Sequence, residues 1–179
     1  MKQPVLHSAN LQLRPLTLAD AEPVQVLAGD ERIADTTASI PHPYPEGAAV
    51  AWLQGVALQR EQGTGLSYAI CREDRLLGVI SLLKIAQGTA ELGYWVGVPH
   101  WGKGIASEAV ACLLDYVQQA RLLAQLKARV LARNRASCRV LERNGFEHTD
   151  TQCTRCGYRQ QEEATHYYSL WLERQPCAD

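Results

Sequence analysis

Glycines gather between residues 97 and 104, where a strand-like segment runs directly into a helix-like one. Glycine lets successive backbone N–H groups of a turn converge, because it adopts conformations that other residues avoid. The start of the following helix adds a partial positive charge. A strand, a glycine turn and a helix in this order predict an anion site that suits phosphate or pyrophosphate.

The same segment comes close to the loop of nucleoside-triphosphate hydrolases. Gly97 to Lys103 spells G-x-x-x-x-G-K, but Gly104 follows where that motif needs Ser or Thr. The Ser or Thr hydroxyl holds magnesium, and glycine has no side chain to replace it. The missing metal ligand argues against a hydrolase. Magnesium-dependent nucleotide binding would support the hydrolase hypothesis again.

Two blocks resemble the GCN5-related N-acetyltransferases. The first, Trp101-Gly102-Lys103-Gly104-Ile105-Ala106, resembles the pyrophosphate loop of that family, with Gly104 and Ala106 at its small-residue positions. Trp101 replaces the family's Gln or Arg, which resembles the branch of RimJ/RimL-like ribosomal-protein N-terminal acetyltransferases. The second block, residues 132–146, resembles the family's N-x-x-S helix with its closing Gly-Phe. Both blocks occur in the family's order, and the resemblance covers nearly the whole chain.

The resemblance implies acetyl-CoA as the co-substrate and no metal. It places the coenzyme in a V-shaped cleft between two core strands. The backbone around Trp95, Val96 and Gly97 would bind the pantetheine and the thioester oxygen, and a backbone donor there contributes roughly 3 kcal/mol. The pyrophosphate would lie on the loop made of Trp101, Gly102, Lys103, Gly104, Ile105 and Ala106.

The resemblance also implies three side chains near the reacting atoms. Glu91, on the strand before the loop, is the candidate general base; the alternative is a solvated strand carboxylate. Asn134 would bond the pantetheine or order a water, and Ser137 would protonate the leaving thiolate. The alternative for Asn134 and Ser137 is helix capping, because both residue types favour helix N-termini.

The acceptor is expected to be a primary amine, either a protein N-terminus or a small molecule. An α-amine has a reference pKa near 8 and a lysine near 10.4, so an α-amine needs less help to become neutral. A non-catalytic acyl-CoA-binding module is the alternative that keeps the fold. Tyr44, Arg14, Trp52 and Tyr167 are further candidates to line the acceptor site. The oligomeric state is left open, with a homodimer among the alternatives.

The elements that must position these residues alternate between hairpin strands and helices. Strands are expected at residues 11–16, 66–72, 76–83, 89–98, 126–131, from 146 onward and at 165–172. Helices are expected at 18–27, 31–37, 46–62, 105–117 and 136–144. This order predicts one α/β (α+β) domain over residues 1–179, with a mostly antiparallel sheet of about seven strands flanked by helices.

Composition limits the function classes further. The chain has 179 residues, is 46% hydrophobic and carries a net charge of -1, which is unlike a dedicated nucleic-acid binder. No apolar run suits a secretion signal or a membrane span, so a cytoplasmic location is expected. Cys153 and Cys156 form a single pair, whereas structural zinc sites usually need four ligands, so no metal site is expected.

Overall fold

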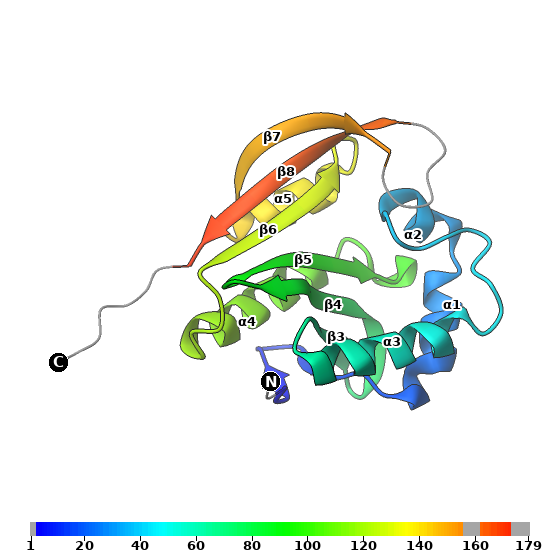
Figure 1. Ribbon diagram of the computed structural model, residues 1–179. Coiled ribbons are helices and arrows are strands. Elements are labelled where there is room, and N and C mark those ends of the chain that lie inside the picture. Colours follow the sequence, from blue (N-terminus) through cyan, green and yellow to red (C-terminus); the bar gives the residue numbers. More distant parts are fainter. Residues whose placement is uncertain (1–2, 156–161, 173–179) are drawn as a thin grey trace.

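The computed structural model describes residues 3–155 and 162–172. Its strands form a single eight-stranded sheet in the order β1-β2-β3-β4-β5-β6-β8-β7. All neighbouring strands are antiparallel except β5 and β6, which are parallel and joined through α4 (Figure 1). The strands are β1 (Leu6–His7), β2 (Gln12–Pro15), β3 (Leu66–Arg72), β4 (Arg75–Ala86), β5 (Thr89–Val96), β6 (Gln125–Leu131), β7 (Glu147–Thr154) and β8 (Glu163–Trp171).

The five α-helices cover both faces of this sheet. Their bounds are α1 (Ala21–Ala28), α2 (Glu31–Thr36), α3 (Ala48–Gln62), α4 (Ile105–Gln119) and α5 (Arg135–Arg143). Short 3-10 turns occupy Leu18–Asp20 and Val98–His100. The α/β (α+β) prediction is confirmed, and the structure adds the short strand β1 to the seven that were expected.

Two apolar clusters explain the layers. In the first, α4 and α5 pack on one face of the sheet through residues such as Val110, Leu113 and Leu141. In the second, α1 and α3 pack on the other face through residues such as Val24 and Leu53. The spacing of three and four residues along α4 turns one side of that helix to the sheet, as its periodicity predicts.

The first helical segment begins at a capping box. Thr17 and Asp20 exchange the two hydrogen bonds of this motif. Asp20 also accepts two hydrogen bonds from the Arg14 guanidinium, at 2.6 and 2.9 Å, and its side chain is only 5% exposed. Arg14 thus ties strand β2 to the start of α1.

The parallel pair β5 and β6 separates soon after it forms. Its register covers only Thr89–Gln125, Ala90–Leu126 and Glu91–Lys127, after which the two strands diverge (Figure 1). Strand β5 stays paired with β4 as far as Val96, and β6 stays paired with β8 as far as Leu131. The result is a V whose apex lies at Glu91 and Lys127, as the resemblance implied.

No helix in the described part of the chain combines the length and the apolar character that a bilayer crossing requires.

Candidate active site

The glycine loop, residues 97–104, leads into the first turn of α4, whose N–H groups have no acceptor within the helix. Gly102 and Gly104 have φ angles of +73° and +74°, which favour glycine. The first bond of α4 runs from the Glu108 N–H to the Gly104 carbonyl at 3.0 Å. The N–H groups of Ile105, Ala106 and Ser107 precede that bond, so no helical carbonyl accepts from them. These donors, together with the positive end of α4, fit an anionic group.

Side chains around the glycine loop brace it and add positive charge. The Trp101 indole N–H donates to the Val96 carbonyl, and Lys103 Nζ donates to the Pro99 carbonyl at 3.0 Å. The pKa of His100 is lowered by burial and by the nearby charges of Lys103, Arg75 and Arg72. The shift favours the neutral form of His100, and it shows that these three cations lie near the loop.

Strand β5 directs its backbone groups alternately toward β4 and toward the V. The Gly97 N–H donates to the Leu77 carbonyl at 2.8 Å, which marks a hydrogen-bonded antiparallel pair. The hydrogen-bonding direction alternates from one residue to the next. The N–H and C=O groups of Trp95 therefore also point to β4, whereas those of Tyr94 and Val96 point into the open V. Of the three residues that the sequence predicts for pantetheine, Val96 therefore has the suitable orientation, although Trp101 already uses its carbonyl.

A hydroxyl pair crosses the open V between β5 and α5. The Tyr94 hydroxyl lies 2.8 Å from Ser137 Oγ and donates to the Ser137 carbonyl at 3.2 Å. Burial raises the pKa of Tyr94, and this outweighs the opposing hydrogen bond from Ser137, so the phenol keeps its proton. Tyr94 was not among the site residues predicted from the sequence. The two-residue alternation of a strand over residues 89–96 would have placed its side chain on the face of the sheet that α5 covers.

Asn134 is the N-cap of α5. Its Oδ1 accepts a hydrogen bond from the Ser137 N–H at 3.1 Å, so the capping alternative holds for this side chain. The cap fixes Ser137 in the first turn of α5, with its hydroxyl toward β5. A role for Asn134 or Ser137 in turnover stays a prediction.

Glu91 is held between two cations at the apex of the V. Its Oε2 accepts from Lys84 Nζ at 2.9 Å and its Oε1 accepts from Arg129 Nε at 2.8 Å. Burial opposes ionisation of Glu91, but the hydrogen bonds from Lys84 and Arg129 outweigh it and lower the pKa of the carboxyl. A carboxylate with a lowered pKa and both oxygens engaged is a weak proton acceptor, so the geometry favours a positioning role.

A second ion-pair network joins α2 to the turn between β6 and α5. Arg133 donates from Nη1 and Nη2 to the two carboxylate oxygens of Asp35, both at 2.7 Å. Its Nε donates to Glu163 at 2.7 Å. Arg133 was not predicted as part of the site, because its partners lie 98 and 30 residues away in the chain.

The aromatic candidates for the acceptor site lie on the α1–α3 face of the sheet. Tyr44, Trp52 and Trp95 are partly buried and pack against the same apolar cluster. Glu91 shares this face with Trp95, because the two residues are four apart on one strand. Tyr167, on β8, pairs with Arg129 on β6 and lies on the same face.

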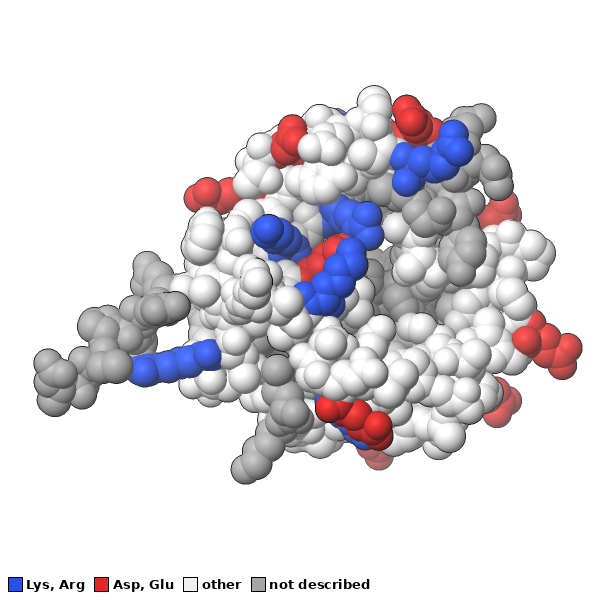
Figure 2. Space-filling view, in the orientation of Figure 1, with Lys and Arg blue, Asp and Glu red and all other residues white. Residues whose placement is uncertain are grey.

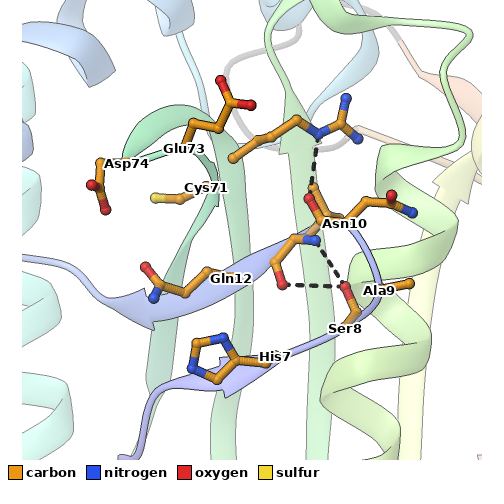
Figure 3. Close-up of a pocket in the computed structure, with 10 residues that line it drawn as sticks. His7, Ser8, Ala9, Asn10, Gln12, Cys71, Glu73 and Asp74 are labelled. Atoms are coloured by element: carbon orange, nitrogen blue, oxygen red, sulfur yellow. Dashed lines mark hydrogen bonds between the residues drawn. The ribbon is translucent and has the colours of Figure 1, made fainter.

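One open cavity lies apart from these residues. It has a volume of about 450 Å³ and is lined by the turn that follows β1 and by the hairpin between β3 and β4 (Figure 3). Among its lining residues, the Arg72 Nε donates to the Asn10 carbonyl at 3.3 Å. None of the residues predicted for the site lines this cavity.

The cysteine pair gives no metal site in the described residues, which contain no cluster of His, Cys, Asp or Glu suited to a metal. Cys153 is an exposed free thiol on β7, and Cys156 lies outside the described residues.

The family model described as an acetyltransferase (GNAT) domain matches residues 10–147. The chain belongs to this family. The extension of the GNAT domain over all of residues 1–179 stays a prediction.

Two curated proteins resemble this GNAT chain over part of their length. "Probable N-acetyltransferase YjcK" of Bacillus subtilis (strain 168) is 38% identical over 92 residues, which are 50% of this chain and 51% of the relative. The ribosomal-protein-serine acetyltransferase of Escherichia coli (strain K12) is 35% identical over 96 residues, 52% of this chain and 54% of the relative. The chain thus spans about half the length of these relatives in the alignments.

A solved structure shares the fold over nearly the whole chain. It is RimL, a ribosomal L7/L12 alpha-N-protein acetyltransferase in complex with coenzyme A, with a TM-score of 0.87 and 18% identity. The superposition covers 94% of this chain and 98% of that one. The GNAT fold that the sequence predicts is therefore confirmed.

Proposed function

We propose that this GNAT chain transfers an acetyl group from acetyl-CoA to a primary amine. The observation that carries the proposal is the row of N–H groups at residues 105–107, which lack helical acceptors beside two glycines of positive φ. This row lies at the open end of the V, and the charges of Lys103, Arg72 and Arg75 act on His100 in the loop before it. Such a site fits the pyrophosphate of coenzyme A.

Acetyl-CoA, when bound, supplies the acyl thioester. We assign its pyrophosphate to Trp101, Gly102, Lys103, Gly104, Ile105 and Ala106, and its pantetheine to the V beside Tyr94, Val96 and Asn134. With its pyrophosphate bound at the loop and its pantetheine between β5 and β6, the coenzyme would have its thioester aligned with the amine. Alignment of two reactants lowers a barrier by several kcal/mol.

The chemistry needs a neutral amine and a thiolate that can leave. The amine nitrogen bonds to the carbonyl carbon, the C–S bond breaks, and the nitrogen gives its extra proton to water. The hydroxyl pair of Ser137 and Tyr94 supplies a proton to the departing sulfur and regains one from water. This assignment extends the prediction for Ser137 and rests on the 2.8 Å contact between the two hydroxyl oxygens.

The acceptor we favour is the α-amine of a polypeptide N-terminus. An α-amine with a reference pKa near 8 is partly neutral at physiological pH, so it needs no strong base. This agrees with a Glu91 whose oxygens are already engaged by Lys84 and Arg129. The Escherichia coli relative is a ribosomal-protein-serine acetyltransferase, which supports the same class. A small-molecule amine is the second candidate; a homodimer and a cytoplasmic location stay predictions.

The test combines calorimetry of coenzyme A with thiol release from acetyl-CoA across peptides and small amines. We expect coenzyme binding and acetylation of peptide α-amines, with lysine side chains modified more slowly. Binding without turnover of any amine would indicate an acyl-CoA-binding module instead. Turnover confined to small amines would contradict the N-terminal assignment but keep the enzyme.

A further inference from the structure

Three basic side chains meet at the apex of the V, on the α1–α3 face of the sheet. Lys84 comes from β4, whereas Lys127 and Arg129 come from β6 and share a face because they are two residues apart. Glu91 on β5 lies between them, paired in register with Lys127 and bonded to both Lys84 and Arg129. We call Lys84, Lys127, Arg129 and Glu91 the cationic patch.

A backbone irregularity aims one member of this patch. The pairing of β4 with β5 shifts between Leu83 and Ala86, which marks a bulge. Lys84 lies inside it with φ +53°, in the left-handed region that residues with a Cβ rarely occupy. Bulges of this kind redirect a side chain, and here the Lys84 ammonium reaches Oε2 of Glu91.

The patch carries more positive than negative charge. Among the described residues of β4, β5 and β6 that meet here, three cations face one carboxylate. Figure 2 shows blue side chains gathered around a red one over the region where β5 and β6 lie in Figure 1. The acidic residues Glu147 and Asp150 belong to β7, and strand β8 separates them from the patch.

The charged groups of the patch are within reach of a ligand. The side chain of Lys84 is 72% exposed and that of Arg129 is 39% exposed, whereas Glu91 between them is 22% exposed. Lys127 is also exposed. An approaching molecule therefore meets ammonium and guanidinium groups before it meets the carboxylate. A carboxylate ligand could contact the exposed ammonium groups of Lys84 and Lys127 without displacing Glu91.

We propose that the cationic patch selects an amine acceptor that carries carboxylates close to its amine. The proposal rests on the acetyl-transfer function above, because the apex of the V is where the thioester would meet the amine. The same positive charges disfavour an ammonium and so lower the pKa of the bound acceptor amine. An acidic N-terminal peptide and a free amino dicarboxylic acid share this chemistry, and the experiment separates them.

The experiment measures binding directly, so it does not depend on turnover. Two fluorescent hexapeptides with N-terminal serine would be compared, one with Asp and one with Asn at positions two to four, with and without coenzyme A. We expect about tenfold tighter binding of the Asp peptide at low salt, since each exposed charge contact contributes a few-fold. The preference should shrink at about 0.5 M salt, because screening weakens exposed contacts.

Lys127→Glu should abolish the preference for the Asp peptide, and Lys84→Gln should reduce it. Arg139→Glu is the matched control, because it makes the same charge change on the exposed side of α5, which covers the other face of the sheet. Its preference should equal that of the unmodified protein. Melting curves of each variant verify that the fold is intact.

The outcomes separate the acceptor class from the enzyme function. Equal binding of the two peptides, or an unchanged preference in Lys127→Glu, overturns the acidic-acceptor proposal. Displacement of the Asp peptide by free glutamate assigns the patch to small acids, and resistance to glutamate assigns it to polypeptide N-termini. If thiol release fails for every amine while the peptide preference persists, the proposed enzyme function fails and the selectivity of the patch stands.

Discussion

The two ends of the V offer different chemical groups to a ligand. At its open end, the glycine loop offers backbone N–H groups at residues 105–107, shaped by Gly102 and Gly104. At its apex, Lys84, Glu91 and Arg129 offer charged side chains from three strands. Backbone donors suit a group that never changes, such as a pyrophosphate, whereas side chains can vary with the acceptor. Under the proposed function, the backbone of one short segment would hold the coenzyme, and side chains from three strands would meet the acceptor.

The largest expected effect concerns the ion pair that supports the α1–α3 side. Asp20→Asn leaves the Arg14 guanidinium without its buried carboxylate, so we expect the free energy of unfolding to fall by about 3 kcal/mol at neutral pH. Denaturant titration measures this loss. Asp30→Asn is the control, because the Asp30–Arg32 pair is more exposed and Asn remains a good N-cap, so the loss of stability should be much smaller.

The same pair predicts a dependence on pH. Burial tends to raise the pKa of Asp20, but the hydrogen bonds from Arg14 and Thr17 outweigh it, so the pKa is lowered in the folded state. The stabilisation is therefore complete above the unfolded pKa, near 4, and is lost as the pH falls through the folded pKa. The stability gap between the unmodified protein and Asp20→Asn should narrow in acid, and an unchanged gap would contradict the assignment. Coenzyme affinity should be equal in the two proteins.

The glycine loop is tested by Gly104→Val. A Cβ at Gly104 would meet no atom within 4 Å, so any loss comes from the strained φ of +74° and from the ligand. The left-handed conformation costs an ordinary residue about 1–2 kcal/mol, so coenzyme A affinity should fall about tenfold or more. Calorimetry measures the change.

Gly63→Val is the matched control for this substitution. Gly63 has φ +71° and equally open surroundings, but it ends α3 far from the glycine loop in the sequence. It should cost similar stability and leave coenzyme affinity unchanged. Equal affinity losses in the two variants would mean that the loop has no special part in binding.

Ser137→Ala tests the hydroxyl pair of Ser137 and Tyr94. Removal of the hydroxyl takes away the partner of Tyr94 and the proposed proton source, and such proton transfers contribute at least about a hundredfold when they are limiting. Because a thiolate with a pKa near 8.5 leaves readily, we expect a smaller loss, about tenfold in kcat. Melting should shift little, since the Asn134 cap uses the Ser137 backbone N–H and not its hydroxyl. A variant that melts early but keeps full kcat would assign Ser137 to stability alone.

Glu91→Gln should have the smallest effect. The carboxylate is engaged by Lys84 and Arg129, so its loss should lower kcat/KM only by about a few-fold. A positioning role predicts the same loss at every pH between about 6 and 9, because no proton transfer to Glu91 is removed. A loss that is large at low pH and rescued near pH 9 would instead assign Glu91 as the general base.

The glycine loop could be read from the sequence because its function lies in local backbone geometry. Gly102, Gly104 and the start of α4 are neighbours in the chain, so one short segment contains the whole anion site. The capping of α5 by Asn134 could be anticipated for the same reason. Short-range patterns of this kind can be recognised without knowledge of the tertiary structure.

The apex could not be predicted in the same way. Lys84, Glu91 and Arg129 meet only because β4, β5 and β6 are neighbours in the sheet, and a bulge turns Lys84 toward Glu91. The sequence offers Glu91 as a candidate base but does not reveal the two cations that engage its carboxylate. The contact between Tyr94 and Ser137 was hidden as well, since the two residues are 43 positions apart and meet across the V.

Amide chemical shifts on addition of coenzyme A test the central claim most directly. The backbone N–H signals of residues 102–107 should move most in a ¹⁵N-labelled sample, followed by those of Tyr94 and Val96 on the open side of β5. The signals of Asn10 and Arg72, which line the cavity in Figure 3, should move less than those of residues 102–107, although the Asn10 N–H donates to Glu108 in the first turn of α4. The largest shifts around Asn10 and Arg72, with residues 102–107 unchanged, would contradict the account and move the coenzyme to that cavity.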